Sequence, residues 1–183
     1  MRYLSLCTSA WLLSLAAFTP SCGDSDSQSS PSTACASALL EADLEPSPFM
    51  GPGVDASGSL MLEPGRDYVV STTYGVPKLG ADGKIPDTYI TAFGAIQEQL
   101  RKEKGLVAYR FASSDACGSG RTLAVWSSEA QMYEFVTSPA HLNAMTNANA
   151  LLEPGYGVTH YTATSANEIT FMAAVPHLAT HRR

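Results

Sequence analysis

Strand-like and helix-like segments alternate in a fixed order in the second half of this chain, and that order limits the folds open to it. Residues 68–74 are rich in β-branched and aromatic side chains, which is typical of a strand. The segment after Pro86 spaces its apolar residues three or four positions apart and ends near Gly105, which predicts a helix with one apolar stripe, formed by Ile90, Phe93, Ile96 and Leu100. Asp87 is the expected N-cap of this helix.

A hairpin and a second helical region follow. Residues 106–111 and 122–126 predict two strands joined by a turn around the sequence Cys-Gly-Ser-Gly. Ser128 opens a capping box that begins a helix, and Ser138 with the proline after it restarts that helix.

Two more strands are expected at the C-terminal end, over residues 156–164 and 168–175. The complete order is then β-α-β-β-α-β with an extra C-terminal strand. This order predicts an α+β, ferredoxin-like split βαβ fold, in which an antiparallel sheet carries both helices on one face. Because the other face would be left uncovered, we expect a homodimer that buries it. The alternative is a monomer whose N-terminal lead-in covers that face.

The first 21 residues predict a secretory signal peptide, because a short basic start precedes an apolar run over residues 4–18. Cys22 follows a small residue at the end of this run, which resembles the lipobox of bacterial lipoproteins, although Thr19 and Pro20 depart from the usual pattern. The resemblance implies that Cys22 becomes the lipidated first residue. The alternative is an ordinary cleaved signal that leaves Cys22 as a plain thiol.

Composition divides the rest of the chain. Residues 22–65 predict a lipid-anchored tether followed by an extended lead-in, because serine dominates the first part and Pro and Gly the second. The folded domain is expected over residues 66–176, with a tail at 177–183. The expected location is the bacterial cell envelope, with the lipid on Cys22 in the membrane and the domain facing the periplasm or the cell exterior.

Cysteine use agrees with export. If Cys7 leaves with the signal and Cys22 carries the lipid, Cys35 and Cys117 remain as a pair in an oxidising compartment. We expect them to form a disulfide, and the alternative is two unpaired thiols. Neither cysteine has a second Cys or a His at the spacing of a zinc site.

Charge and missing motifs exclude several functions. The formal net charge of −6 provides no attraction for phosphates, so nucleic acid is not an expected partner. No G-x-S-x-G, H-E-x-x-H, P-loop or dinucleotide-binding motif occurs. We expect neither a metal nor another cofactor.

Two stretches of the chain resemble the antibiotic-biosynthesis-monooxygenase superfamily of dimeric α+β barrels, and the resemblance is closest to its uncharacterised branches. These stretches are residues 123–130, LAVWSSEA, and the sequence Phe-Val-Thr-Ser-Pro-Ala-His that begins at Phe135. Members of that superfamily oxidise polycyclic phenols without a cofactor or degrade heme. In the heme-degrading branch, the helix that follows the corresponding strand carries the histidine that ligates the iron. The same spacing after Trp126 falls on Met145 in this chain, so that ligand is missing.

The resemblance implies a cofactor-independent oxygenase that acts on a small aromatic or quinone-type compound. Trp126, His141 and His160 are the candidate catalytic residues, since an indole can stack on an aromatic substrate and an imidazole can act as a base near neutral pH. Each also has a structural explanation, in the core or at the surface. The alternative function is a non-catalytic small-molecule-binding or protein-interaction module tethered to the envelope.

Overall fold

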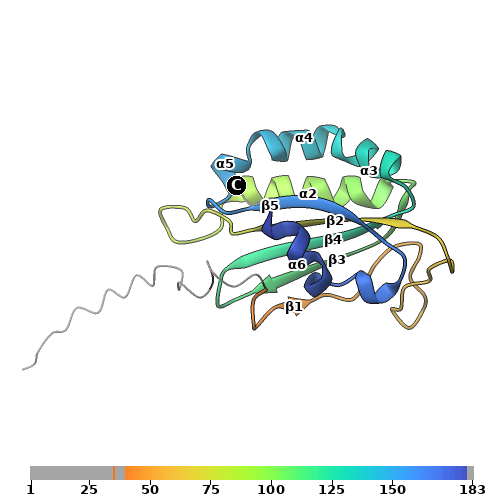
Figure 1. Cartoon of the computed structure of the whole chain (residues 1–183). Helices are drawn as coiled ribbons and strands as arrows, with labels where there is room; N and C mark the ends of the chain where they lie inside the picture. The colour runs from red at the N-terminus through yellow and green to blue at the C-terminus, as the bar shows by residue number, and fades with distance from the viewer. Residues whose placement is uncertain (1–34, 36–39, 181–183) are drawn as a thin grey trace, which may run out of the picture. The chain divides into compact units, whose positions relative to one another are not determined.

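The computed structural model describes residue 35 and residues 40–180. The predicted signal segment, Cys22 and most of the tether lie outside these residues. A five-stranded antiparallel sheet runs through the described part with the strand order β1-β3-β4-β2-β5 (Figure 1). The α+β, ferredoxin-like fold predicted from the sequence is confirmed.

The elements follow one another along the chain in nearly the predicted order. The strands are β1 (Glu45–Pro46), β2 (Tyr68–Gly75), β3 (Leu106–Ser114), β4 (Ser119–Trp126) and β5 (Gly157–Ala163). The helices are α2 (Asp87–Lys102), α3 (Glu129–Val136), α4 (Pro139–Thr146), α5 (Ala148–Leu151), the 3-10 turn η1 (Ala166–Glu168) and α6 (Phe171–Ala179).

Helices α2, α3 and α4 lie over one face of the sheet (Figure 1). Local signals set their starts as the sequence predicts. The Ser128 side chain accepts a hydrogen bond from the Gln131 backbone N–H, and Ser138 accepts one from the His141 N–H. The start of α2 differs by one residue, because Pro86 is the N-cap and Asp87 is already helical.

The C-terminal strand predicted over residues 168–175 is wrong, because that segment forms η1 and α6. The Thr170 side chain accepts a hydrogen bond from the Ala173 N–H at 3.0 Å, which caps α6. The buried residues of α6 recur at helical spacing and face the sheet: Phe171, Ala174, Val175 and Leu178. The β-branched and aromatic content of residues 168–175 resembles that of a strand, but the buried residues recur with the period of a helix.

Helix α6 also contains the start of what the sequence predicts as a tail. The His177 ring stacks on the Tyr161 ring at a centroid distance of 4.2 Å. The Tyr161 hydroxyl in turn donates to the Glu168 carbonyl oxygen at 2.8 Å. These contacts fix α6 and η1 to β5, so the folded part extends past residue 176.

The second face of the sheet is covered by α6 and by the lead-in. A cluster of buried residues from β2, β3 and β4 is centred on Val70, Ala108 and Val125, which are all fully buried. Partly buried lead-in residues pack against it: Leu40, Leu44, Phe49, Val54, Leu60 and Leu62. The uncovered face on which the expectation of a homodimer rested is therefore occupied by the chain itself.

Phe171→Ala should destabilise the domain, because Phe171 is 5% exposed and anchors α6 on the sheet. Removal of a buried phenyl group costs about 3 kcal/mol or more. The matched control is Met172→Ala on the same helix, where the side chain is 66% exposed and the expected loss is below about 0.5 kcal/mol. Urea unfolding measures both, and equal losses would contradict this packing of α6.

Candidate functional site

A cavity of about 530 Å³ lies between the helix-covered face of the sheet and helices α2, α4 and α5. It occupies the end of the sheet where β2 and β3 finish and where β4 and β5 begin. Its volume is within the range of small-molecule sites. The cavity is lined mainly by aliphatic and aromatic side chains, with a few polar groups.

One row of directly paired residues forms the cavity floor. Phe111 pairs with Thr122, Thr122 pairs with Thr73, and Thr73 pairs with Val158 across four neighbouring strands. The hydroxyl groups of Thr73 and Thr122 lie 2.7 Å apart in a hydrogen bond, so these two polar groups satisfy each other. The floor is therefore apolar in character despite its two threonines.

The next row of paired residues toward this end of the sheet consists of small residues. Their short side chains leave open space between this row and the helices. Ser113 pairs with Gly120, and Gly120 pairs with Gly75. A Cβ atom added at Gly120 would have no heavy atom within 4 Å, so open space begins directly above that backbone. Larger side chains in this row would fill the cavity.

Aromatic rings from α2 form one wall. The Tyr89 and Phe93 rings stack with an interplanar angle of 9°, and Phe93 meets the floor residue Phe111 edge to face at 5.3 Å. Burial raises the pKa of the Tyr89 hydroxyl, so this group stays protonated at neutral pH and can donate a hydrogen bond. The wall can stack against a planar ligand and offer it one donor.

Helices α4 and α5 form the opposite wall, which includes Met145, Leu151 and the predicted site residue His141. The His141 imidazole is 8% exposed, and its Nδ1 lies 3.0 Å from the Val136 carbonyl oxygen. A carbonyl can only accept, so Nδ1 carries the proton and Nε2 is the acceptor of the neutral ring. Burial lowers the pKa of His141, and the bond to Val136 opposes this in part. The cavity therefore contains a neutral imidazole that can accept a proton.

The structure does not bring the three candidate catalytic residues together, because Trp126 and His160 do not line the cavity that His141 lines. The Trp126 side chain is fully buried between the sheet and α3, where its Nε1–H donates to the Ser71 hydroxyl at 2.9 Å. His160 lies on β5, which is an edge strand of the sheet, and its Nε2 is 3.4 Å from a carboxylate oxygen of Glu129. Trp126 therefore has the structural role in the core, and His160 has the one at the surface.

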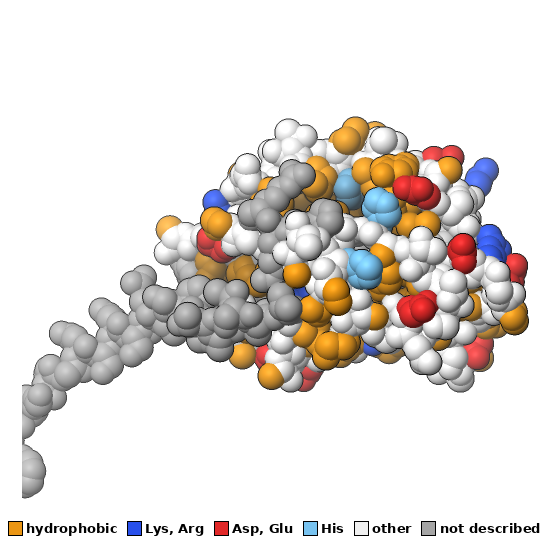
Figure 2. Space-filling model, viewed as in Figure 1, with side chains coloured by type: hydrophobic (Ala, Val, Ile, Leu, Met, Phe, Trp, Pro, Cys, Tyr) orange, Lys and Arg blue, Asp and Glu red, His pale blue; other side chains and the backbone are white. Residues whose placement is uncertain are grey.

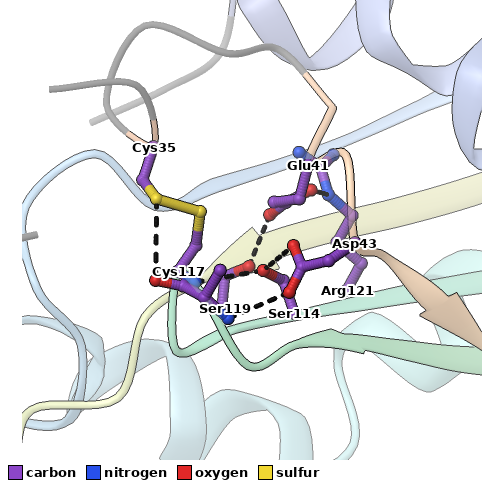
Figure 3. Close-up of a disulfide and its surroundings, with 8 residues drawn as sticks. Cys35, Glu41, Asp43, Ser114, Cys117, Ser119 and Arg121 are labelled. Atoms are coloured by element: carbon purple, nitrogen blue, oxygen red, sulfur yellow. Dashed lines mark hydrogen bonds and ion pairs between the residues drawn. A yellow bond between two sulfur atoms is a disulfide. The ribbon is translucent and has the colours of Figure 1, made fainter. Parts of the chain in front are cut away.

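The disulfide expected from the sequence is present. Cys35 and Cys117 are bonded with a Cα–Cα distance of 5.5 Å (Figure 3). The turn between β3 and β4 that carries Cys117 also holds the lead-in through Asp43, which accepts from the Ser114 hydroxyl at 2.6 Å and from the Ala116 N–H at 2.9 Å. The bond from Ser114 is the main reason that the pKa of Asp43 is lowered. The lead-in is thus fixed beside the cavity.

A buried ion pair lies beneath the cavity floor. Arg121 Nε is 2.7 Å from a Glu41 carboxylate oxygen, and both side chains are almost fully buried (Figure 3). The Ser119 hydroxyl donates to the other Glu41 oxygen, and the Arg121 guanidinium lies 4.8 Å from the Tyr74 ring centroid. The pair ties the lead-in to β4 on the face opposite the cavity.

Sequence reasoning missed Tyr89, Gly120 and the ion pair. Arg121 could have been noticed, because it alternates with Leu123 and Val125 and so shares their buried strand face. An arginine on such a face needs an acidic partner. Nothing in the sequence marks Glu41 as that partner.

Two negative findings apply to the described residues. No helix in residues 40–180 is long and apolar enough to cross a membrane. No group of three or more His, Cys, Asp or Glu side chains in the described part is arranged to hold a metal ion.

No protein-family model matches the chain, and no curated protein matches it. Protein SO0527 from Shewanella oneidensis is a similar solved structure, with 18% identity, a TM-score of 0.46, and coverage of 55% of this chain and 95% of its own. SnoaB, a cofactor-independent oxygenase from Streptomyces nogalater, has 16% identity, a TM-score of 0.40, and coverage of 55% and 93%. A candidate antibiotic biosynthesis monooxygenase from Nitrosomonas europaea has 16% identity, a TM-score of 0.44, and coverage of 54% and 92%. Similar structures thus include monooxygenase-like proteins, but at these scores the likeness says nothing of activity.

Loss of the disulfide should lower stability, because it closes a loop of 82 residues. The expected loss is about 3 kcal/mol, or roughly 10 °C in Tm. Calorimetry would compare the wild type with a Cys35→Ser/Cys117→Ser variant, each with and without reductant. Reductant should lower the Tm of the wild type alone, and a variant as stable as the oxidised wild type would contradict the expectation.

The buried His141 should make stability depend on pH. The unfolded chain binds a proton near the ordinary pKa of 6.5, whereas the folded state binds it only at lower pH. The contribution of the neutral ring to stability is therefore complete above that value and is lost as the pH falls from it toward the lowered pKa. Urea unfolding at about pH 7.5 and about pH 5 should show a larger loss for the wild type than for His141→Gln. Equal losses would contradict a buried neutral imidazole.

Proposed function

We propose that this chain is an envelope-tethered protein whose cavity binds a small phenolic or hydroquinone-type aromatic compound and oxidises it with molecular oxygen to a quinone. One observation carries the proposal: a neutral, buried imidazole, His141, lines a mainly apolar cavity of about 530 Å³. A planar aromatic molecule suits the aromatic wall at Tyr89 and Phe93, and its hydroxyl group suits the acceptor Nε2.

The chemistry needs no bound cofactor. His141 Nε2 accepts the proton of the phenol, and the resulting phenolate is electron-rich enough to reduce oxygen. The Tyr89 hydroxyl, when it donates to the phenolate oxygen, stabilises the developing charge. A phenol that gains one oxygen atom and loses two hydrogen atoms becomes a quinone, and the second oxygen atom leaves as water, so the substrate supplies all the electrons.

The envelope location is part of this proposal. The disulfide between Cys35 and Cys117 supports it, because structural disulfides persist in oxidising compartments. Cys22 would carry the lipid, and the signal over residues 1–21 would direct export. The predicted homodimer stays a prediction, and it would need a surface other than the covered face of the sheet.

Ligand binding gives the first test. Titration of the protein with 2-naphthol, followed by naphthol fluorescence, should show saturable binding. His141→Gln should weaken binding by about tenfold through loss of the hydrogen bond to Nε2. The matched control is His160→Gln, at a histidine outside the cavity, and its affinity should equal that of the wild type.

A second variant fills the cavity without touching its polar groups. Gly120→Val places a side chain in the open space above Gly120 and should abolish binding while the fold is kept, as circular dichroism would check. Gly94→Ala is the control, because Gly94 has equally open surroundings on the exposed side of α2. Retained binding in Gly120→Val would contradict this cavity as the site.

Oxygen uptake separates the enzyme from the alternative. With 1,5-dihydroxynaphthalene as substrate, an oxygen electrode should record uptake that the wild type supports and that His141→Gln reduces strongly. Saturable binding without uptake would contradict the oxygenase and would leave a tethered small-molecule-binding module, which the apolar lining of the cavity also suits.

A further inference from the structure

The loop between β2 and α2, residues 76–86, presents apolar side chains to solvent at the open end of the cavity. Leu79 is 59% exposed and Ile85 is 45% exposed, and Met145 on the facing helix is 36% exposed. Ile85 and Met145 also line the cavity. The exposed apolar surface is therefore continuous with the apolar cavity wall.

Backbone hydrogen bonds define a turn in this loop and attach its base to α5. The Gly80 N–H donates to the Lys84 carbonyl at 2.8 Å, and the Gly83 N–H donates to the Gly80 carbonyl at 2.9 Å. Gly83 has a φ of +73°, which favours glycine. At the base of the loop, the Lys78 N–H donates to the Leu151 carbonyl at 2.9 Å.

Charged groups flank the apolar residues of the loop. The Lys84 side chain is 82% exposed and lies 4.0 Å from Asp82. Hydrophobic side chains lie beside basic and acidic ones at the end of the domain that carries this loop (Figure 2). An apolar tip with an exposed lysine beside it suits the boundary between the headgroups and acyl chains of a bilayer.

The tether joins the domain at the same end. Gly75, which precedes the loop, pairs with Gly120 of β4, and Cys117 lies in the turn just before β4. Cys35 is bonded to Cys117 and stands thirteen positions after Cys22. Thirteen fully extended residues span at most about 45 Å. A lipid on Cys22 would thus keep Cys35, at this end of the domain, within about 45 Å of the membrane.

We infer that the 76–86 loop docks on the phospholipid bilayer and that the cavity takes its aromatic ligand from the membrane. This inference rests on the proposed function, both for the lipid anchor and for the ligand. The ligand class is then a lipid-soluble phenol or hydroquinone with an alkyl chain. Apolar burial drives the docking, because a chain of net charge −6 is not attracted to anionic lipid. The tether makes a weak contact effective by raising its local concentration.

Tryptophan fluorescence of the lipidated mature protein tests the docking. The protein is reconstituted in phosphatidylethanolamine–phosphatidylglycerol vesicles with brominated acyl chains, which quench indole rings that enter the bilayer. Trp126 gives a constant background because it is fully buried, and Trp11 would leave with the signal. The added fluorescence of Leu79→Trp should fall by about half or more on docking.

Met61→Trp is the matched control. Met61 is 54% exposed, and its N–H donates to the Gly53 carbonyl. The Gly53 N–H donates to the Val107 carbonyl near the start of β3, at the end of the sheet away from the cavity. Its added fluorescence should change by less than about a tenth if that end stays in water. Equal quenching at the two positions, or no quenching at Leu79→Trp, would overturn the docking.

Transfer of the ligand separates failure of the inference from failure of the proposed function. Leu79→Asp should slow uptake of an alkylated 2-naphthol from vesicles at least about fivefold, because a carboxylate in place of the apolar side chain is costly to insert into the bilayer. It should bind the same compound in detergent with unchanged affinity, since Leu79 does not line the cavity. Unchanged uptake from vesicles would overturn the inference, whereas absence of binding in detergent by the wild type would overturn the proposed function itself.

Discussion

The sheet of this protein is apolar on both faces, and a stable chain must cover both of them. Helices α2, α3 and α4 cover one face, and the other is covered by α6 with the lead-in. Specific contacts hold α6 and the lead-in in place on this second face. The disulfide and the Glu41–Arg121 pair hold the lead-in, and the stacking of His177 on Tyr161 holds α6. An ion pair this deeply buried stabilises only while both partners remain, so it fixes the position of the lead-in more than it adds to stability.

The cavity exists because one face of the sheet is filled unevenly. Trp126, Met132 and Phe135 fill the end near α3, where their side chains interlock in the core. At the other end, Ser113, Gly120 and Gly75 supply almost no side-chain volume below α2 and α4. Protein interiors are normally close-packed. The gap is therefore a property of this row of small residues, and His141 is positioned at its wall by the Ser138 cap and the Val136 carbonyl.

Sequence reasoning predicted the fold well because its signals are local. The stripe of α2, the Ser128 and Ser138 caps and the hairpin each depend on residues a few positions apart. It failed at α6, where strand-type residues follow a helical period. Of the three candidate site residues, His141 lines the cavity, whereas Trp126 and His160 lie elsewhere. Whether Trp126 fills a core or faces a cavity depends on Phe135 and Ser71, which the sheet and α3 bring together in space.

Methyl NMR of the mature protein with 13C-labelled methionines, titrated with 2-naphthol, tests the central claim most directly. Met145 lines the cavity, Met132 lies in the filled core, and Met61 and Met172 are exposed elsewhere. A ligand in the cavity should shift the Met145 methyl resonance first and most, with the exposed Met61 and Met172 resonances unchanged. Shifts at Met61 or Met172 with an unmoved Met145 would contradict the assignment of the site.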